Sequence, residues 1–177
     1  TVFENQTVQD NLVVSLKSKR DPMSTLLYKA GKTDLSKVEE LAIEIGLEQS
    51  LDRIAGELSH GQKQWLEIAM LLGQKPSLML IDEPVAGLTD EETELTADLL
   101  KSLSGENTIL VIDHDMEFIR RLDSNVTVLN QGSVLCGGSM DKIQNDPKVI
   151  EVYLGKQEDI YVKVLEVKSL NTYCLLY

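Results

Sequence analysis

The 177-residue sequence is short of several residue types, and each shortage excludes a class of protein. Its two cysteines, Cys136 and Cys174, have no CxxC spacing, so neither a disulfide framework nor a cysteine-based metal site is predicted. Lysine and arginine total 17 against 29 acidic residues, and the resulting net charge of −12 argues against a nucleic-acid surface. No apolar run is long enough to span a bilayer, and the first residues do not resemble a signal peptide.

What is present is enough apolar sequence, 42 % of the residues, for one domain with its own core. Helical patterns dominate the first 73 residues. A helix is expected after a cap at Thr7 or Asp10, and residues 17–34 are expected to form a connection around a short helix at 23–28. From Ser36 the apolar residues recur with the helical period until Gly46; they are Val38, Leu41, Ala42 and Ile45.

Strands and helices alternate after residue 73. Apolar runs at 78–81 and 108–112 predict buried strands, the first of them covered on both faces. Thr89 and Glu92 form a capping box for a helix expected to bury Leu95, Leu99 and Leu103. A second helix is expected to bury Phe118, Ile119 and Leu122. A hairpin around residues 131–132, closed by Gly137 and Gly138, and two short helices at 141–145 and 147–154 follow.

This order predicts an α/β fold, in which a helical subdomain precedes a mostly parallel sheet with flanking helices. We place the subdomain at residues 1–73 and the sheet-containing core at 74–156. Residues 157–177 are expected to form a tail, with a strand-like stretch at 160–167.

The segment Ser59-His60-Gly61-Gln62 opens a helix. Ser59 is predicted as the N-cap and Gln62 completes a capping box. Free N–H groups and the helix dipole make such an end attractive to phosphate. The alternative is a well-capped core helix that buries Trp65, Ile68, Ala69 and Leu72.

Charged residues follow both predicted strands. Asp82 and Glu83 end the first, where one carboxylate can hold Mg²⁺ and the other can reach a water. His114 follows the second and can contact a phosphate or position a carboxylate. Three alternatives stay open: a surface turn, a histidine satisfied by Asp113 or Asp115, and a phosphohydrolase metal cluster built from all five residues.

These motifs, in this order and spacing, resemble the ATP-binding subunits of ABC transporters over residues 1 to about 156. The segments at 58–67, 83–93 and 147–155 resemble the branched-chain amino acid and urea uptake group, especially its urea-transport members. The resemblance implies the C-terminal part of a P-loop NTPase-like domain.

The resemblance also implies roles for individual residues. Asp82 matches the Walker B aspartate that holds Mg²⁺, Glu83 the catalytic glutamate that activates water, and His114 the switch histidine. The D-loop, which crosses the dimer interface, matches Ala86, Gly87, Leu88, Thr89 and Asp90. The signature loop, which contacts the γ-phosphate of ATP on the opposite subunit, matches Ser59, Gly61 and Gln62, with His60 in place of the more frequent glycine.

One part of the family pattern is missing. The phosphate-cradling GxxxxGK[ST] loop does not occur, and the chain begins with Thr1, so we expect the cradle to precede it. Residues 1–12 resemble the segment after the family's Q-loop, so Gln6 is not the Q-loop glutamine. We expect this fragment alone to be inactive. The tail resembles the opening strand of another ABC subunit, and the alternative is an ordinary C-terminal extension.

The function implied is ATP hydrolysis coupled to uptake of urea or branched-chain amino acids, with ATP and Mg²⁺ as cofactors. The implied partners are a second ATP-binding subunit in a homo- or heterodimer, membrane permeases and, indirectly, a solute-binding protein, with no nucleic acid. The expected location is the cytoplasmic face of the inner membrane. A soluble ABC ATPase without a transporter and a metal-dependent phosphohydrolase are the alternatives.

Overall fold

The computed structural model describes residues 1–16, 31–105, 107–155 and 173–176. The chain forms two compact units, Thr1–Pro76 and Ser77–Tyr177. The helix predicted at 23–28 and the strand-like stretch at 160–167 lie outside the described residues. None of the helices in the described ranges has the length and apolarity needed to cross a membrane.

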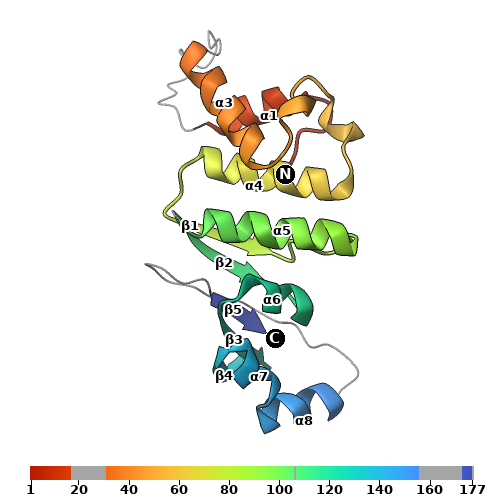
Figure 1. The fold of residues 1–177 in the computed structure, drawn as a ribbon, viewed down its shortest axis with the longest axis vertical. Coiled ribbons are helices and arrows are strands. Elements are labelled where there is room, and N and C mark those ends of the chain that lie inside the picture. The colour runs from red at the N-terminus through yellow and green to blue at the C-terminus, as the bar shows by residue number, and fades with distance from the viewer. Residues whose placement is uncertain (17–30, 106, 156–172, 177) are drawn as a thin grey trace. The chain divides into compact units, whose positions relative to one another are not determined.

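The first unit is helical. It contains α1 (Val8–Ser15), α3 (Lys32–Glu44) and α4 (His60–Gly73), with 3₁₀ turns at Glu48–Ser50 and Ala55–Glu57 (Figure 1). Thr7 caps α1, because its Oγ1 accepts a hydrogen bond from the amide of Asp10 at 3.0 Å. The cap is therefore Thr7 and not Asp10, the other residue that the sequence allowed.

Helices α1, α3 and α4 contact one another around an apolar core. Gly73, at the end of α4, shows how closely α4 approaches α1, since an added Cβ would lie 2.7 Å from Oγ of Ser15. The helix α3 begins at Lys32, earlier than expected, because Gly31 precedes it as N-cap and donates its N–H to Asp34 at 3.2 Å. The most deeply buried apolar residues of this unit are Val8, Leu12, Val38, Ala42, Leu47, Ala55, Leu66, Ile68 and Ala69.

The second unit is built on a five-stranded sheet with the order β1-β2-β5-β3-β4. Its strands are β1 (Leu78–Asp82), β2 (Thr108–Ile112), β3 (Asn125–Asn130), β4 (Ser133–Ser139) and β5 (Tyr173–Leu176). The first four strands in that order pair in parallel and only β4 runs antiparallel to its neighbour β3. The predicted mostly parallel α/β sheet is therefore confirmed.

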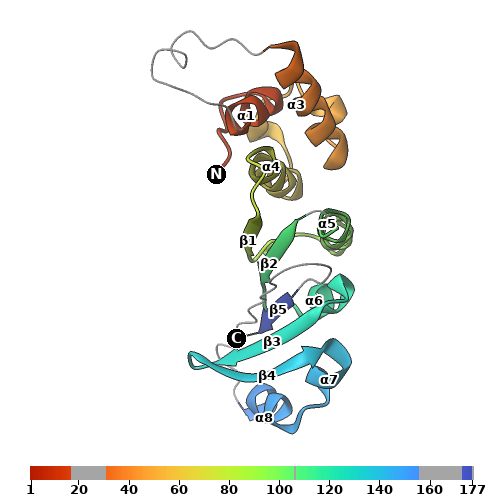
Figure 2. The same ribbon diagram turned by 90° about the vertical axis from the view of Figure 1, so that its left-hand side faces the viewer.

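The helices of this unit are α5 (Asp90–Leu103), α6 (Met116–Leu122), α7 (Met140–Gln144) and α8 (Pro147–Gly155). Figure 2 shows α5 and α6 on the same side of the sheet. The predicted burial of Phe118, Ile119 and Leu122 on α6 is confirmed. Helices α5 and α6 cover one face of β1 and β2, and no helix among the described residues of this unit covers the other face.

The prediction that β1 is buried on both faces is wrong. Its residues alternate between exposed and buried, and Leu80 is 61 % exposed while Met79 and Ile81 are buried. The reason is geometric, because successive side chains of a strand point to opposite faces and only one face of β1 is covered here. Strand β2 agrees with expectation, since Ile109, Leu110 and Val111 are all buried.

The buried face of α5 also differs from the prediction. Leu95 is 49 % exposed and Leu99 is only half-buried, whereas Ala97, Leu100 and Leu103 are buried together with Thr96. The buried face of α5 is therefore rotated away from the predicted line of leucines, toward Thr96, Ala97 and Leu100. Of the three predicted positions, only Leu103 is part of the core.

The C-terminal segments contain one confirmed motif and two differences. The predicted hairpin is present, and Gln131 and Gly132 both have positive φ at its turn, +52° and +77°. The glycines expected to close it do not, because β4 continues through Gly137 and Gly138 to Ser139. The strand β5, between β2 and β3, lies in the segment treated as a tail from sequence.

Candidate functional site

The start of α4 has the geometry that the capping box predicts. Oγ of Ser59 accepts a hydrogen bond from the amide of Gln62 at 3.2 Å, and Oε1 of Gln62 accepts one from the amide of Ser59 at 3.1 Å. Ser59 and His60 are exposed, whereas Gly61 is buried. The start of α4 therefore presents polar groups and the positive end of the helix dipole to solvent.

The loop before α4 is tied to the first residues of the chain. The amide of Gly56 donates to the carbonyl of Glu4 at 2.9 Å, and the amide of Ala55 donates to the carbonyl of Gln6 at 2.8 Å. Glu4 also forms an ion pair with Lys63 of α4, at 3.0 Å. Sequence patterns do not reveal these contacts, because they join segments that are far apart in the chain.

The strand ends of the second unit bring the predicted acids and the histidine to one edge of the sheet. In the parallel register Asp82 lies opposite Ile112, so the residues after each are neighbours. Glu83 has a φ of +47°, an uncommon conformation for a side-chain-bearing residue, and its amide donates to the carbonyl of Ile112 at 2.7 Å. Such strained backbone is typical of functional sites.

Glu83 and His114 come together at this edge. Oε1 of Glu83 lies 3.6 Å from Nδ1 of His114, and the two side chains are 40 % and 53 % exposed. The contact becomes an ion pair when the imidazole is protonated. A solvent-accessible carboxylate beside an imidazole can accept a proton from a water molecule, which is the chemistry of a general base.

Asp113 is a buried acid behind His114. Its Oδ1 lies 3.8 Å from Nδ1 of His114, and it accepts hydrogen bonds from the amides of His114 at 2.8 Å and Asp115 at 3.0 Å. Burial raises the pKa of Asp113, while the two amides and the charge of His114 act in the opposite direction. The local partner that the sequence left open for the histidine is therefore present, alongside Glu83.

The segment predicted as the D-loop lies beside this edge. Amides of Ala86 and Leu88 donate to the carbonyls of Glu83 and Val85, at 3.2 and 3.1 Å, and fold the segment into a turn. Thr89 and Glu92 form the predicted capping box of α5, with the amide of Glu92 donating to Oγ1 of Thr89 at 3.2 Å. A cleft of about 560 Å³ is lined by this segment and by the residues after β2; they are Val85, Ala86, Gly87, Leu88, Asp90, Thr93, Glu94, Asp113, His114, Asp115, Glu117, Phe118 and Arg121.

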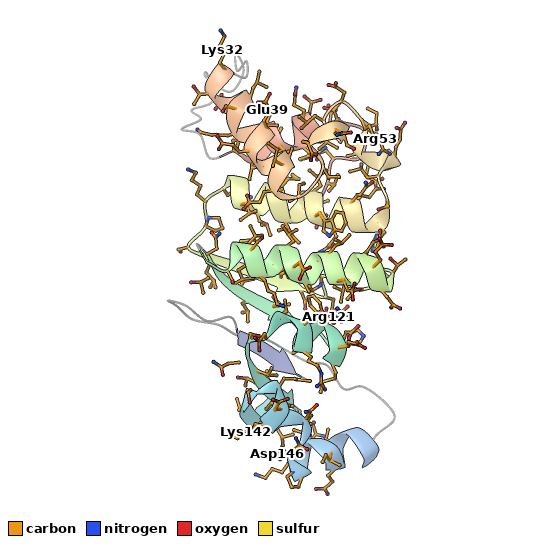
Figure 3. All side chains as sticks on the ribbon, in the orientation of Figure 1. Lys32, Glu39, Arg53, Arg121, Lys142 and Asp146 are labelled. Atoms are coloured by element: carbon orange, nitrogen blue, oxygen red, sulfur yellow. The ribbon has the colours of Figure 1, made fainter. Side chains whose placement is uncertain are left out.

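Arg121 is a cleft residue that sequence reasoning missed. It lies between α6 and α5 (Figure 3), where its Nη1 is 2.6 Å from Oε1 of Glu94. Glu117, four residues earlier on α6, lies 3.8 Å from Nη2 of Arg121 and is a local signal, but the closer partner, Glu94, belongs to another helix. A weak signal for Asp113 is present in the sequence. The Asp-x-Asp pattern directly before a helix favours side chains that accept hydrogen bonds from nearby backbone amides.

The residues of the alternative metal cluster do not all come together in the structure. Among the described residues, no three His, Cys, Asp or Glu side chains lie close enough to hold a metal ion, so the five-residue phosphohydrolase cluster is not formed. Asp82 is exposed at the carboxyl end of β1. A single exposed carboxylate fits Mg²⁺, which is usually held by one or two carboxylates together with substrate phosphates and water.

Family profiles and individual relatives all indicate similarity to ABC transporter ATP-binding proteins. The profile of the ABC transporter family matches residues 1–86, and that of the branched-chain amino acid ATP-binding cassette transporter matches residues 133–159. The branched-chain amino acid transport ATP-binding protein LivG of Escherichia coli is 34 % identical over 164 residues, which cover 88 % of this chain and 64 % of LivG. BraF of Pseudomonas aeruginosa is 37 % identical over 115 residues, covering 64 % of this chain and 45 % of BraF.

Solved structures agree with the sequence relatives. The ADP conformation of an ATP-binding cassette of an ABC transporter superposes with a TM-score of 0.72 at 26 % identity, covering 86 % of this chain and 64 % of that one. The chain thus spans less than two thirds of the length of these relatives.

Proposed function

Because the chain belongs to the family of ABC transporter ATP-binding proteins, we propose that the whole protein is the ATP-hydrolysing subunit of an ABC importer. The observation that carries this proposal is the contact between Glu83 and His114 at the ends of two neighbouring parallel strands. Ligands of open α/β sheets bind beyond these strand ends.

In this proposal the strand-end residues act on ATP bound by their own subunit. Glu83 accepts a proton from the attacking water, and His114 fixes the orientation of the Glu83 carboxylate and contacts the γ-phosphate. Asp82 would hold Mg²⁺, and the ion would neutralise negative charge on the phosphates. The sequence contains no GxxxxGK[ST] loop, so the phosphate cradle is assigned to a part of the family domain that this chain does not span.

The helix start acts on a different ATP molecule in this proposal. Ser59, Gly61 and Gln62 contact ATP held by a second ATP-binding subunit, and the exposed N-terminus of α4 favours the negative γ-phosphate. The D-loop at residues 86–90 crosses to that subunit. Closing the dimer then drives the permeases, and hydrolysis reopens it.

The solute proposed is a branched-chain amino acid or urea. The relatives' names support the first, and the segments at 58–67, 83–93 and 147–155 resemble the urea group. We place the subunit on the cytoplasmic face of the membrane, bound to permeases that receive solute from a binding protein. Uptake of labelled leucine and labelled urea by cells with and without the gene distinguishes the two solutes.

The test of hydrolysis is Glu83→Gln in the full-length protein. Loss of a general base typically lowers the rate by about 10²–10⁴-fold, so hydrolysis should nearly cease and an ATP-bound dimer should accumulate on gel filtration. Glu40→Gln, an exposed glutamate on α3, is the matched control and should hydrolyse ATP normally. Normal turnover in the Glu83 variant would refute the assigned base, and hydrolysis without co-purifying permeases would favour a soluble ABC ATPase.

A further inference from the structure

Asp113 stands apart from every other acid in the described part of the chain. It is 2 % exposed and is the only buried residue there with an ionisable carboxyl group. Burying a carboxylate is costly unless its oxygens are paired. Its Oδ2 is buried and has no hydrogen-bond partner among the described residues, so the site retains an acid that packing alone does not favour.

The other oxygen of Asp113 holds the turn that presents His114. Oδ1 accepts from the amides of His114 and Asp115, and Oδ1 of Asp115 accepts in turn from the amides of Glu117 and Phe118, at 2.8 and 3.0 Å. Phe118 is fully buried. The backbone from the end of β2 into α6 is therefore held by Asp113 and Asp115, the residues on either side of His114.

Two carboxylates face the same nitrogen of His114. Nδ1 lies 3.8 Å from Oδ1 of Asp113 and 3.6 Å from Oε1 of Glu83. A neutral imidazole carries its proton on either nitrogen, and a carboxylate beside one nitrogen favours the tautomer with the proton there. Asp113 is held in place by the backbone, whereas Glu83 is 40 % exposed and is proposed to exchange protons with water, so Asp113 is the fixed partner.

We propose that Asp113 is a positioning residue that keeps the ring proton of His114 on Nδ1, and so fixes the orientation of the imidazole beside Glu83. The catalytic consequence rests on the proposed function. The position of the ring proton is independent of the proposed function, because it depends only on the geometry of the strand ends. In other enzymes an aspartate behind a histidine sets its tautomer in the same physical way.

The test is ¹⁵N NMR of the histidine rings in the full-length protein, with the His114 signals assigned from their loss in His114→Gln. In the unaltered protein Nδ1 should carry the proton and Nε2 should not. Asp113→Asn keeps an acceptor for the two amides but removes the charge, and the proton should move toward Nε2. Asp115→Asn makes the same change in the same turn and should leave the tautomer unaltered, as should the signals of His60.

A second variant keeps the proposal open to refutation if Asp113→Asn does not fold. Glu83→Gln removes the other, more exposed carboxylate, and the proton should remain on Nδ1 because Asp113 is still present. A shift to Nε2 in that variant, or an unchanged tautomer in folded Asp113→Asn, would overturn the proposal.

Kinetics then separate this proposal from the proposed function. Asp113→Asn should lower kcat for ATP roughly tenfold or more, the usual size of such supporting effects, with little change in KM. If the tautomer follows Asp113 while Glu83→Gln still hydrolyses ATP, the positioning role stands and the assigned base fails. If the tautomer does not follow Asp113, the positioning role fails whatever the hydrolysis data show.

Discussion

The start of α4 and the strand ends of the second unit are both proposed to act on ATP, yet they are built in different ways. Ser59 and Gln62 satisfy each other within one turn of one helix, through two solvent-exposed hydrogen bonds. Glu83 and His114 meet only because β1 and β2 pair in parallel, and behind them lies a buried acid. The first site is a local arrangement, whereas the second depends on the tertiary structure of its unit.

This difference has a consequence for how each site tolerates change. A helix cap contributes a modest amount of stability and can be replaced by another cap residue without moving the helix. The strand-end site combines strained backbone at Glu83 with a buried, half-paired carboxyl at Asp113, and both are maintained by packing elsewhere in the unit. The strand ends should therefore be the more sensitive of the two.

The largest effect should come from removing packing in the unit that carries the strand ends. Leu100→Ala on α5 should lower the free energy of unfolding by about 2–5 kcal/mol, because Leu100 is 2 % exposed. Leu95→Ala on the same helix is the control and should change it by less than about 0.5 kcal/mol, as for other exposed positions. Denaturant titration of both variants measures this; equal losses would mean that the observed buried face of α5 is wrong.

A smaller effect is expected from the local caps. Ser59→Ala and Thr89→Ala each remove the N-cap oxygen of a capping box and should each cost about 1 kcal/mol of unfolding free energy. Ser59→Asp should restore most of the loss, since aspartate is an equally good cap. A loss at Ser59 several times that at Thr89 would contradict the view that the start of α4 is a local arrangement.

The smallest effect concerns the pH dependence of stability. Burial raises the pKa of Asp113 above the ordinary value of an aspartate, so the folded state resists ionisation of this group. Its contribution to stability is full below about pH 3.8 and is lost as pH rises through the folded pKa. Relative to the unaltered protein, Asp113→Asn should therefore gain stability between acid and neutral pH; a relative loss over that range would contradict the sign.

Local features were predictable from the sequence and tertiary ones were not. The caps at Thr7, Ser59 and Thr89 depend on residues three positions apart, so their chemistry is visible in the sequence. The exposure of Leu80 depends on which face of the sheet a helix covers, and the strand at 173–176 depends on pairing with two distant strands.

Individual site residues follow the same division. Glu83 and His114 could be predicted because both follow apolar strands, and the ends of parallel strands meet at one edge. For Arg121 only the spacing to Glu117 is local, and its closer ion pair with Glu94 joins two helices and could not be predicted. The partners of Asp113 are local, but its burial is not, and burial is what distinguishes it from Asp115.

Ser59 and Glu83 of one chain are proposed to act on two different ATP molecules. Mixed dimers of differently tagged full-length copies test it, using Ser59→Arg and Glu83→Gln. With one change on each copy, one ATP site carries both defects and the other is intact, so hydrolysis should persist at about half the normal rate. With both changes on one copy and none on the other, each site carries one defect and hydrolysis should nearly cease. The reverse result would show that both residues act on the same chain's ATP and would contradict the account.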